Sequence, residues 1–198
     1  MKKNTLLLHA CCAPCAAHVF EVLTQDFRVS AYFYNPNISP YHEYERRLEE
    51  LLWYSEKREF PLIVGFYDSR EWTKSVKPYR FDGERSERCM HCFLHRLEQT
   101  FRYARDNSFD AVASVMSISP HKDAEMINEV GRKLKKRYGL GYIEADFKKN
   151  DGFRRSVEIS REQGFYRQNY CGCVYSNQER KKPQIWNIST KNSYHPTS

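Results

Sequence analysis

The seven cysteines of this 198-residue chain are the residues whose type and spacing point most directly to chemistry. They lie in three tight groups: Cys11, Cys12 and Cys15, then Cys89 and Cys92, then Cys171 and Cys173. Scattered cysteines would indicate thiols packed in a core, whereas grouped cysteines indicate metal ligands or redox chemistry. The sequence therefore predicts a metal centre or a redox-active thiol site.

The first four of these residues can supply a complete ligand set. The three-residue spacing of Cys89 and Cys92 places both sulfurs on one face of a predicted helix. Cys11 and Cys12 are adjacent, and in a turn both can face one site. Four thiolates fit an iron–sulfur cluster or a closed zinc site. Adjacent cysteines are unusual in structural zinc sites, so the pattern favours a cluster, with zinc or metal-free thiols as alternatives.

The remaining cysteines leave several interpretations open. Cys171 and Cys173, separated by one glycine, could form a small, easily reduced disulfide, chelate a second metal or stay unpaired. Cys15 follows the first pair by one helical turn and either binds metal or packs in the helix. Arg96 either places positive charge beside an anionic cluster or forms a surface ion pair. The nearby histidines are more often structural than catalytic: His9, His18, His91 and His95.

Apolar runs alternate with amphipathic segments along the chain. The apolar runs predict strands at residues 5–9, 28–34, 61–66, 110–116 and 142–145. The amphipathic segments predict helices at about residues 14–25, 41–60, 71–76, 85–107, 123–138 and 152–163. We expect Ser119 or the loop before Asp123 to cap the helix at 123–138. This alternation predicts an α/β protein with a parallel sheet and helices on both faces.

The predicted strands place polar residues at one edge of the sheet. In parallel sheets, sites form at the carboxyl ends of the strands. Cys11 and Cys12 follow the first predicted strand, Asn35 follows the second, and Ser117 and Ser119 follow the fourth. We therefore expect the first cysteine group to lie at this edge.

Positive charge is concentrated in the last third of the chain. The net charge of +7 comes entirely from residues 131–198, where basic residues alternate with aromatic ones. A one-sided basic surface is typical of proteins that bind a phosphate backbone, and exposed rings can stack on unpaired bases. The alternative is a solvated helix face above rings that belong to the core.

Other protein classes are excluded or disfavoured. No apolar run approaches the roughly 20 residues that span a bilayer. Only Leu6, Leu7 and Leu8 run together before Cys11, too few for a secretory signal, so we expect a cytoplasmic protein. The Gly-x-Gly-x-x-Gly fingerprint of nicotinamide and flavin enzymes is absent, as is a Ser-Gly-Gly-x-Asp-Ser phosphate loop.

Four motifs in order resemble the epoxyqueuosine reductases of the QueH type. They are HACCAPC at residues 9–15, YNPNI at 34–38, CMHC at 89–92 and CGC at 171–173. The resemblance covers nearly the whole chain up to about Arg180. It implies a three-layer sandwich of the HUP/PP-loop-like (nucleotide alpha-hydrolase-like) type, formed by residues 1–180, with residues 181–198 as a C-terminal tail.

The resemblance also implies a reaction. The epoxide of epoxyqueuosine at the wobble position of tRNA is reduced to the alkene of queuosine, the last step of queuosine biosynthesis, without cobalamin. By the same resemblance, Cys11, Cys12, Cys89 and Cys92 are ligands of a [4Fe-4S] cluster, and Cys171 and Cys173 are a redox-active pair. Alternatively, some of Cys12, Cys15, Cys171 and Cys173 hold an additional mononuclear iron. The electron donor is not identified by the sequence.

Substrate contacts are expected from residues at the strand ends and in the basic region. Asn35 and Asn37 can bind the modified base or ring diol, or simply form the turn around Pro36. Lys122 and Arg155, with the basic last third, would hold the phosphates of the anticodon arm. Tyr34, also assigned to the substrate, is one of three candidates for the general acid, with His9 and Asp146.

Two alternative functions remain at this point. One is an iron–sulfur enzyme of tRNA thiolation, against which the missing phosphate loop counts. The other is a zinc-stabilised RNA-binding module without catalysis. Bound iron and sulfide would separate the module from both enzymes, and dependence on ATP would separate thiolation from reduction.

Overall fold

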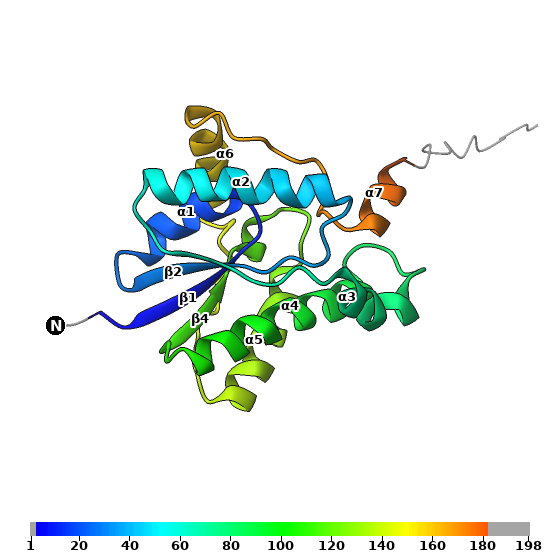
Figure 1. Ribbon diagram of the computed structural model, residues 1–198, viewed down its shortest axis with the longest axis horizontal. Coiled ribbons are helices and arrows are strands. Elements are labelled where there is room, and N and C mark those ends of the chain that lie inside the picture. The colour runs from blue at the N-terminus through cyan, green and yellow to red at the C-terminus, as the bar shows by residue number, and fades with distance from the viewer. Residues whose placement is uncertain (1–2, 182–198) are drawn as a thin grey trace, which may run out of the picture.

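The computed structural model describes residues 3–181 and contains one sheet of parallel strands (Figure 1). The strand order is β3-β2-β1-β4-β5. The strands are β1 Thr5–Ala10, β2 Arg28–Phe33, β3 Leu62–Val64, β4 Ala111–Ser114 and β5 Gly141–Tyr142. Each predicted strand is present, although the one expected at residues 142–145 has only two residues in the sheet. The parallel sheet confirms the predicted fold class.

The helices alternate with the strands along the chain. They are α1 Ala13–Leu23, α2 Tyr41–Lys57, α3 Ser69–Val76, α4 Glu87–Asp106, α5 Ala124–Tyr138, α6 Gly152–Glu162 and α7 Val174–Lys181, with short 3-10 turns at Lys77–Tyr79 and Val115–Ile118. α1, α2 and α6 cover one face of the sheet, and α4 and α5 cover the other (Figure 1). The result is the predicted three-layer α/β sandwich.

The central strand β1 joins the two cores. Leu6 and Leu8 point into the core beneath α1, α2 and α6, and Leu7 points into the core beneath α4 and α5. All three side chains are fully buried. A strand buried on both faces appears in the sequence as a continuous apolar run. Replacing one of these leucines with alanine is expected to cost about 2–5 kcal/mol.

The loop between β4 and α5 differs from the prediction in two ways. The strand expected to reach residue 116 ends at Ser114, because the Ser114 hydroxyl accepts a hydrogen bond from the Met116 backbone N–H and starts a 3-10 turn. The cap of α5 is Asp123 itself, not Ser119. The Asp123 carboxylate accepts from the backbone N–H groups of Glu125 and Met126.

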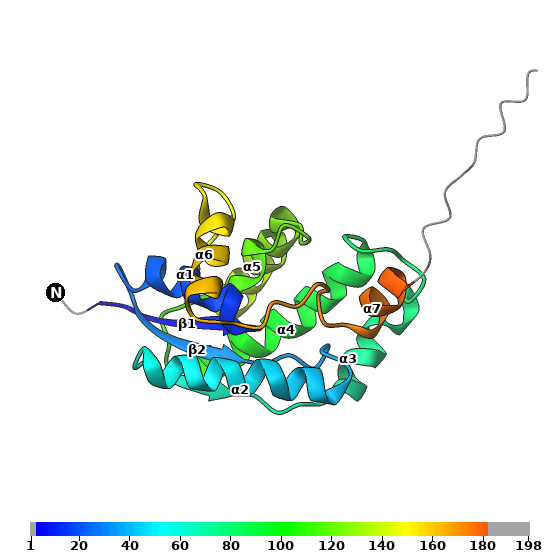
Figure 2. The same ribbon diagram turned by 90° about the horizontal axis from the view of Figure 1, so that it is seen from above.

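Helix α7 was not predicted. It packs beside α3, away from the main sheet, where Trp72, Val76 and Cys173 form a small core of their own (Figure 2). The predicted domain boundary at residue 180 falls in the last turn of α7, and residues 182–198 of the predicted tail lie outside the described residues. Between residues 3 and 181, no helix is long and apolar enough to cross a membrane.

Candidate metal centre

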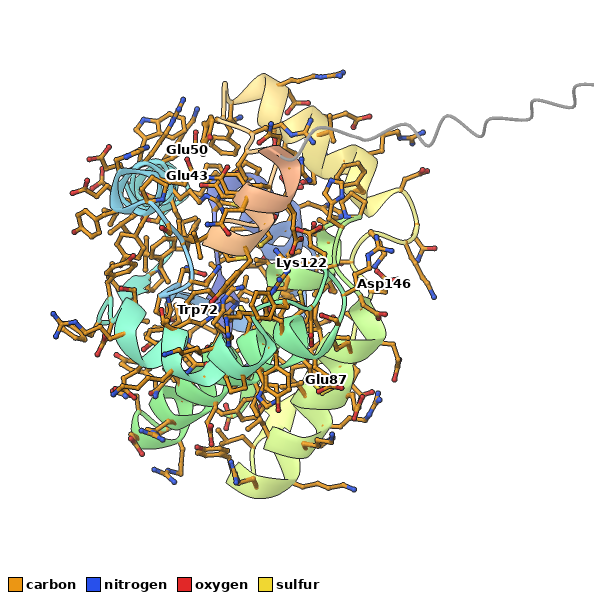
Figure 3. The ribbon with its side chains drawn as sticks, turned by 90° about the vertical axis from the view of Figure 1, so that its right-hand side faces the viewer. Glu43, Glu50, Trp72, Glu87, Lys122 and Asp146 are labelled. Atoms are coloured by element: carbon orange, nitrogen blue, oxygen red, sulfur yellow. The ribbon has the colours of Figure 1, made fainter. Side chains whose placement is uncertain are left out.

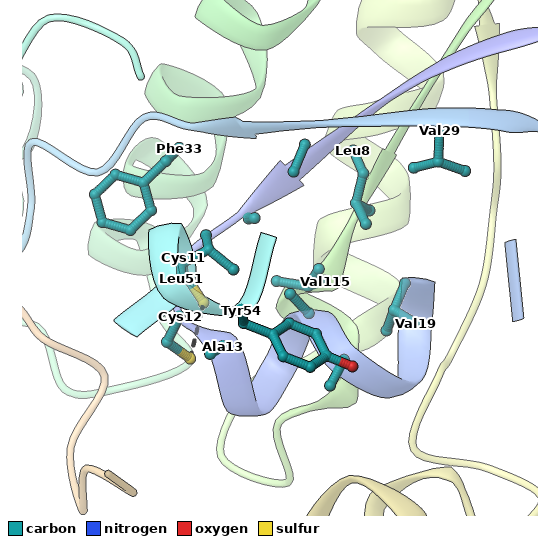
Figure 4. Close-up of a cluster of buried hydrophobic side chains, with 14 of the residues drawn as sticks. Leu8, Cys11, Cys12, Ala13, Val19, Val29, Phe33, Leu51, Tyr54 and Val115 are labelled. Atoms are coloured by element: carbon teal, nitrogen blue, oxygen red, sulfur yellow. Dashed lines mark hydrogen bonds between the residues drawn. The ribbon is translucent and has the colours of Figure 1, made fainter. Parts of the chain in front are cut away.

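The sulfurs of Cys11, Cys12 and Cys15 gather where β1 ends and α1 begins, and Figure 4 shows the first two. The sulfurs of Cys11, Cys12 and Cys15 all lie within 4.8 Å of one another, and those of Cys11 and Cys12 are 3.8 Å apart. The chain turns here because Cys12 has an extended backbone and Pro14 occupies the first turn of α1. Hydrogen bonds from Cys12 and Cys15 lower the pKa of the Cys11 thiol well below its usual range. Such a group can bind a soft metal ion.

The other four cysteines line one small cavity of about 30 Å³. Cys89 and Cys92 come from the start of α4, and Cys171 and Cys173 come from the segment that leads into α7. The Cys171 and Cys173 sulfurs are 3.4 Å apart and share a hydrogen bond. Donation from the Cys173 thiol stabilises the Cys171 thiolate, and this bond, the largest influence on the pKa of Cys171, lowers it to about 6. A second thiol-rich site therefore lies between α3, α4 and α7.

The structure thus sorts the cysteines into a group of three and a group of four. The predicted cluster ligands take two from each: Cys11 and Cys12 from the first, Cys89 and Cys92 from the second. The predicted redox pair belongs to the second group. This ligand set therefore stays a prediction, and it requires the two groups to face one another.

Arg96 links the two groups. Only 2% of it is exposed, and it lines the cavity of the second group. Burial raises the pKa of Cys92, and the charge of Arg96 offsets part of this rise. Hydrogen bonds from Cys12 and Cys15 lower the pKa of Cys11, and the charge of Arg96 adds to this effect. The Arg96 side chain donates to the neutral Asn35 side-chain oxygen at 2.6 Å and to the Cys92 sulfur, and no carboxylate of residues 3–181 forms an ion pair with it. A buried cation is costly without an anion nearby, so the site is built for thiolates.

Lys122 adds a second positive charge at the mouth of the same cavity. Figure 3 shows Lys122 near the centre of this end of the molecule, between Trp72 and Asp146. Burial lowers the pKa of the Lys122 ammonium, but the Cys11 and Cys15 sulfurs outweigh this effect, so the pKa is raised overall. Lys122 therefore lines the cavity of the second cysteine group and also interacts electrostatically with the first group.

Arg47 of α2 supplies a third cation. It is 1% exposed, pairs with Glu43 at 2.6 Å and donates to the Cys171 carbonyl oxygen at 3.4 Å. Burial lowers its pKa, but the Cys12 and Cys11 sulfurs outweigh this effect and raise it. A Cβ on Gly172 would lie 3.0 Å from the Arg47 guanidinium, and Gly172 has a φ of +110°. Only glycine suits this position between the two cysteines.

The predicted substrate-binding residues occupy different surroundings. Both ends of the Asn35 amide are used within the protein, since its N–H₂ donates to the Ala10 carbonyl at 2.8 Å and its oxygen accepts from Arg96. Asn37 lines the small cavity, and its buried Oδ1 has no hydrogen-bond partner in the described part of the chain. The Tyr34 hydroxyl contacts His95 Nε2 at 3.1 Å. Asn37 is therefore the best placed of these to meet a ligand.

None of the three candidate general acids lines the cysteine cavity. Burial lowers the pKa of His9 to about 3, and both its ring nitrogens contact the protein, at Ser114 Oγ and the Tyr34 carbonyl. Asp146 is paired with Lys148 at 2.8 Å. His9 is thus a neutral structural residue.

The basic last third does not form a single surface. α5 runs away from the cysteines, so the lysines near its end lie at the opposite edge of the sheet. Arg155 in α6 lies within 4.0 Å of three carboxylates, on Glu21, Glu158 and Glu162. Of the predicted phosphate contacts, only Lys122 borders the cysteine cavity.

Two polar side chains near the cysteines were missed by the sequence analysis. The indole N–H of Trp72 is buried without a nitrogen or oxygen acceptor between residues 3 and 181. Burial raises the pKa of the Cys92 thiol, and the hydrogen bond from Trp72 offsets part of this rise. The Gln168 amide donates to the Cys12 sulfur at 3.2 Å. A single tryptophan or glutamine outside the cysteine motifs carries no signal of such a contact, so neither could be found without the fold.

The fold and the site together define a class: α/β proteins whose parallel sheet carries a cysteine-rich centre at its carboxyl edge. A model of one family, epoxyqueuosine reductase QueH, matches residues 6–179. The chain belongs to this QueH family.

Curated relatives agree with this assignment. The epoxyqueuosine reductase QueH of Streptococcus pyogenes serotype M1 is 39% identical over 180 residues, which cover 88% of this chain and 71% of the relative. That of Histophilus somni is 40% identical and covers 90% of this chain and 74% of the relative. The epoxyqueuosine reductase QueH of Thermotoga maritima is 36% identical, and the match covers 90% of this chain and 93% of the relative.

Proposed function

We propose that this chain reduces the epoxide of epoxyqueuosine in tRNA to the alkene of queuosine. The relatives that cover most of its length carry the name of this activity. The observation that carries the proposal is the placing of the cysteines beside buried cations: three gather at the carboxyl edge of the sheet, and four line one cavity together with Arg96 and Lys122. Because the substrate is a tRNA, we expect the protein to act in the cytoplasm.

The donor set fits an iron–sulfur centre. We propose Cys11, Cys12, Cys89 and Cys92 as ligands of a [4Fe-4S] cluster, since four thiolates are what such a cluster requires. Arg96 supports this set because it acts on Cys11 and Cys92 alike. Its buried charge fits the negative charge of a thiolate-bound cluster.

The surroundings also suit sulfur rather than oxygen ligands. The Trp72 indole N–H and the Arg96 Nε are buried without a nitrogen or oxygen acceptor among residues 3–181, and both side chains hydrogen-bond the Cys92 sulfur and line the small cavity. Sulfur atoms of a cluster accept such N–H groups, which tune its potential. Cys15 is left as a possible ligand of an additional iron, together with some of Cys12, Cys171 and Cys173.

The reaction consumes two electrons and two protons and releases the epoxide oxygen as water. Such a cluster would supply electrons, and an additional iron with an open position would supply a Lewis acid. Oxidation of the Cys171 and Cys173 dithiol to a disulfide releases two electrons and two protons, which balances the reaction. Their sulfurs are 3.4 Å apart and must approach to about 2.05 Å to form the bond.

The remaining residues prepare the site for this chemistry. Arg47, Arg96 and Lys122 keep positive charge beside the thiolates. The Asn37 oxygen is free to accept a hydroxyl of the substrate ring. An external electron donor must reduce the disulfide again after each turnover.

The direct test is reduction of the modified nucleoside. The anaerobically purified protein is incubated with tRNA that carries epoxyqueuosine and with dithionite, and the tRNA is digested and its nucleosides separated by mass. We expect conversion of epoxyqueuosine to queuosine without added ATP. Absence of conversion by iron-loaded protein, or dependence on ATP and a sulfur donor, would contradict the proposal.

A further inference from the structure

We propose that a second cavity, on the α1 and α6 side of Cys15, receives the modified base of the tRNA. This inference rests on the proposed function and adds to it the place where the guanine-like base is held. The cavity measures about 90 Å³ and lies between the start of α1, the loop after β4 and the segment around Gln168. Cys15 forms part of its wall, so a base held there would lie against the first cysteine group.

The position of this cavity in the fold favours a nucleoside. In the order β3-β2-β1-β4-β5, the chain adds β2 and β3 on one side of β1 and then β4 and β5 on the other side. The switch point of the sheet therefore lies between β1 and β4. Ligands of open parallel sheets bind in the crevice at this switch point, beyond the carboxyl ends of the two strands. Pro14 and Cys15 follow β1, and Ser119 and Pro120 follow β4, and all four line the cavity.

Size separates this cavity from the one lined by four cysteines. One water molecule needs about 10–15 Å³ of cavity volume. The 30 Å³ cavity therefore holds two or so waters, too little for a purine-like ring. The 90 Å³ cavity holds several times as much and can admit the edge of a planar base.

Charge separates it from the other hollows near this end of the molecule. Its lining contains Arg167 and no carboxylate. The hollow beside Tyr34 is lined by Asp68 and Glu71, which would repel an RNA backbone. The cysteine cavity likewise includes Glu84 and Asp123.

Gln168 provides a polar contact aimed at a ligand. Its Nε2 donates to the Cys12 sulfur at 3.2 Å, which fixes the amide plane. Its Oε1 is buried and has no partner among residues 3–181. A buried carbonyl oxygen without a donor is costly, and the Watson–Crick edge of a guanine-like base offers N–H donors.

Phe153 and Arg167 complete the pocket. The half-buried Phe153 ring lines the cavity, and the Arg167 guanidinium lies 5.9 Å from the ring centroid. An aromatic ring is a platform for a base that has left its stack, and an exposed arginine at the rim can bind the adjoining phosphate. The enzyme would thus take up the wobble base much as base-flipping enzymes do.

The test uses an anticodon stem-loop RNA with either epoxyqueuosine or guanosine at the wobble position. Binding is measured by fluorescence anisotropy without reductant, so that no turnover occurs. The variants are Phe153→Leu, Gln168→Leu and Arg167→Gln. Arg105→Gln is the matched control for the last of these, because Arg105 is an exposed arginine at the other end of the molecule.

We expect each of the three variants to weaken binding of the modified stem-loop by about 10-fold. Phe153→Leu and Gln168→Leu should also weaken binding of the guanosine stem-loop, because guanosine presents the same Watson–Crick edge and a similar ring, with thermal melting unchanged. Arg105→Gln should bind like the wild type. If all three pocket variants bind the modified stem-loop like the wild type, the pocket is wrong.

The outcome also separates this inference from the proposed function. If the wild type reduces epoxyqueuosine and the pocket variants keep its affinity and KM, the proposed function stands and the pocket does not. Protein that binds the modified stem-loop through Phe153 and Gln168, yet reduces nothing, retains the pocket and loses the function.

Discussion

Arg96 is the residue whose surroundings constrain the chemistry most. A guanidinium that is 2% exposed and forms no ion pair with a carboxylate of residues 3–181 requires negative charge nearby, and thiolates such as that of Cys92, to which it donates, can supply it. Arg96→Gln removes this charge. We expect the variant to lose most of its iron to a chelator under conditions in which the wild type retains it.

The same substitution should act unequally on the two forms of the protein. In the metal-free form, removing an uncompensated buried charge offsets the loss of the hydrogen bond to Asn35, so the thermal melting temperature should change little. In the metal-loaded form the melting temperature should fall by several degrees. Equal destabilisation of both forms would show that Arg96 serves only the fold.

The cysteines of the two groups should respond differently to substitution. We expect Cys89→Ser to lose iron and Cys171→Ser to keep it, because the first is proposed as a cluster ligand and the second as half of a redox pair. Both variants should fail to reduce epoxyqueuosine through repeated turnovers. Iron analysis of the two proteins is the measurement. Similar iron loss in both would make Cys171 a ligand, as its place in the cavity with Cys89 also allows.

At the scale of elements, the packing of α5 against β5 depends on a glycine. A Cβ on Gly131 would lie 2.1 Å from the Tyr142 ring. Glycine in a helix is normally about 1 kcal/mol less favourable than alanine. Here we expect Gly131→Ala to lower the free energy of unfolding by about 1–3 kcal/mol, because the ring has to move.

Chemical denaturation of three proteins checks this expectation. Tyr142→Ala should make the Gly131 substitution much less harmful, so the double variant should be more stable than the sum of the single effects predicts. A Gly131→Ala protein more stable than the wild type would mean that helix propensity outweighs the contact.

The elements also show where sequence patterns are sufficient. Buried strands such as β1 were predicted because a sheet covered on both faces needs continuous apolar runs. Helix α7 was missed because it has only eight residues and little apolar surface, and it packs on Trp72 and Val76, far away in the sequence. The clustered cysteines predicted a metal site, and the structure brings Cys11, Cys12 and Cys15 within 4.8 Å of one another. The buried Arg47, Trp72 and Gln168 around it could not be predicted, since only the fold brings them to the sulfurs.

At the scale of the whole molecule, the basic residues of the last third separate into two regions. Lys149 and Arg167 are exposed near the carboxyl edge of the sheet, whereas Lys135 and Lys136 are exposed near the end of α5, at the opposite edge. If tRNA approaches the cysteine site, only the first region can hold its phosphates nearby. From the sequence alone the two basic regions are predicted to form one surface, because the sequence shows their order along the chain and not their positions in space.

Two matched double variants test this arrangement. Lys149→Gln with Arg167→Gln should weaken tRNA binding and reduce the slope of log affinity against log salt, by roughly 0.7–0.9 for each lost phosphate contact. Lys135→Gln with Lys136→Gln removes the same charge and should leave both quantities near the wild-type values. Equal effects of the two pairs would indicate a general attraction to the net positive charge.

The central claim is that the cysteines hold an iron–sulfur centre. The measurement that tests it most directly is the content of iron, sulfide and zinc per chain after anaerobic purification, with an absorption spectrum before and after dithionite. The account predicts about four iron and four sulfide per chain and a broad band near about 400 nm that bleaches, with iron above four if a mononuclear site is also filled. One zinc without sulfide would contradict it.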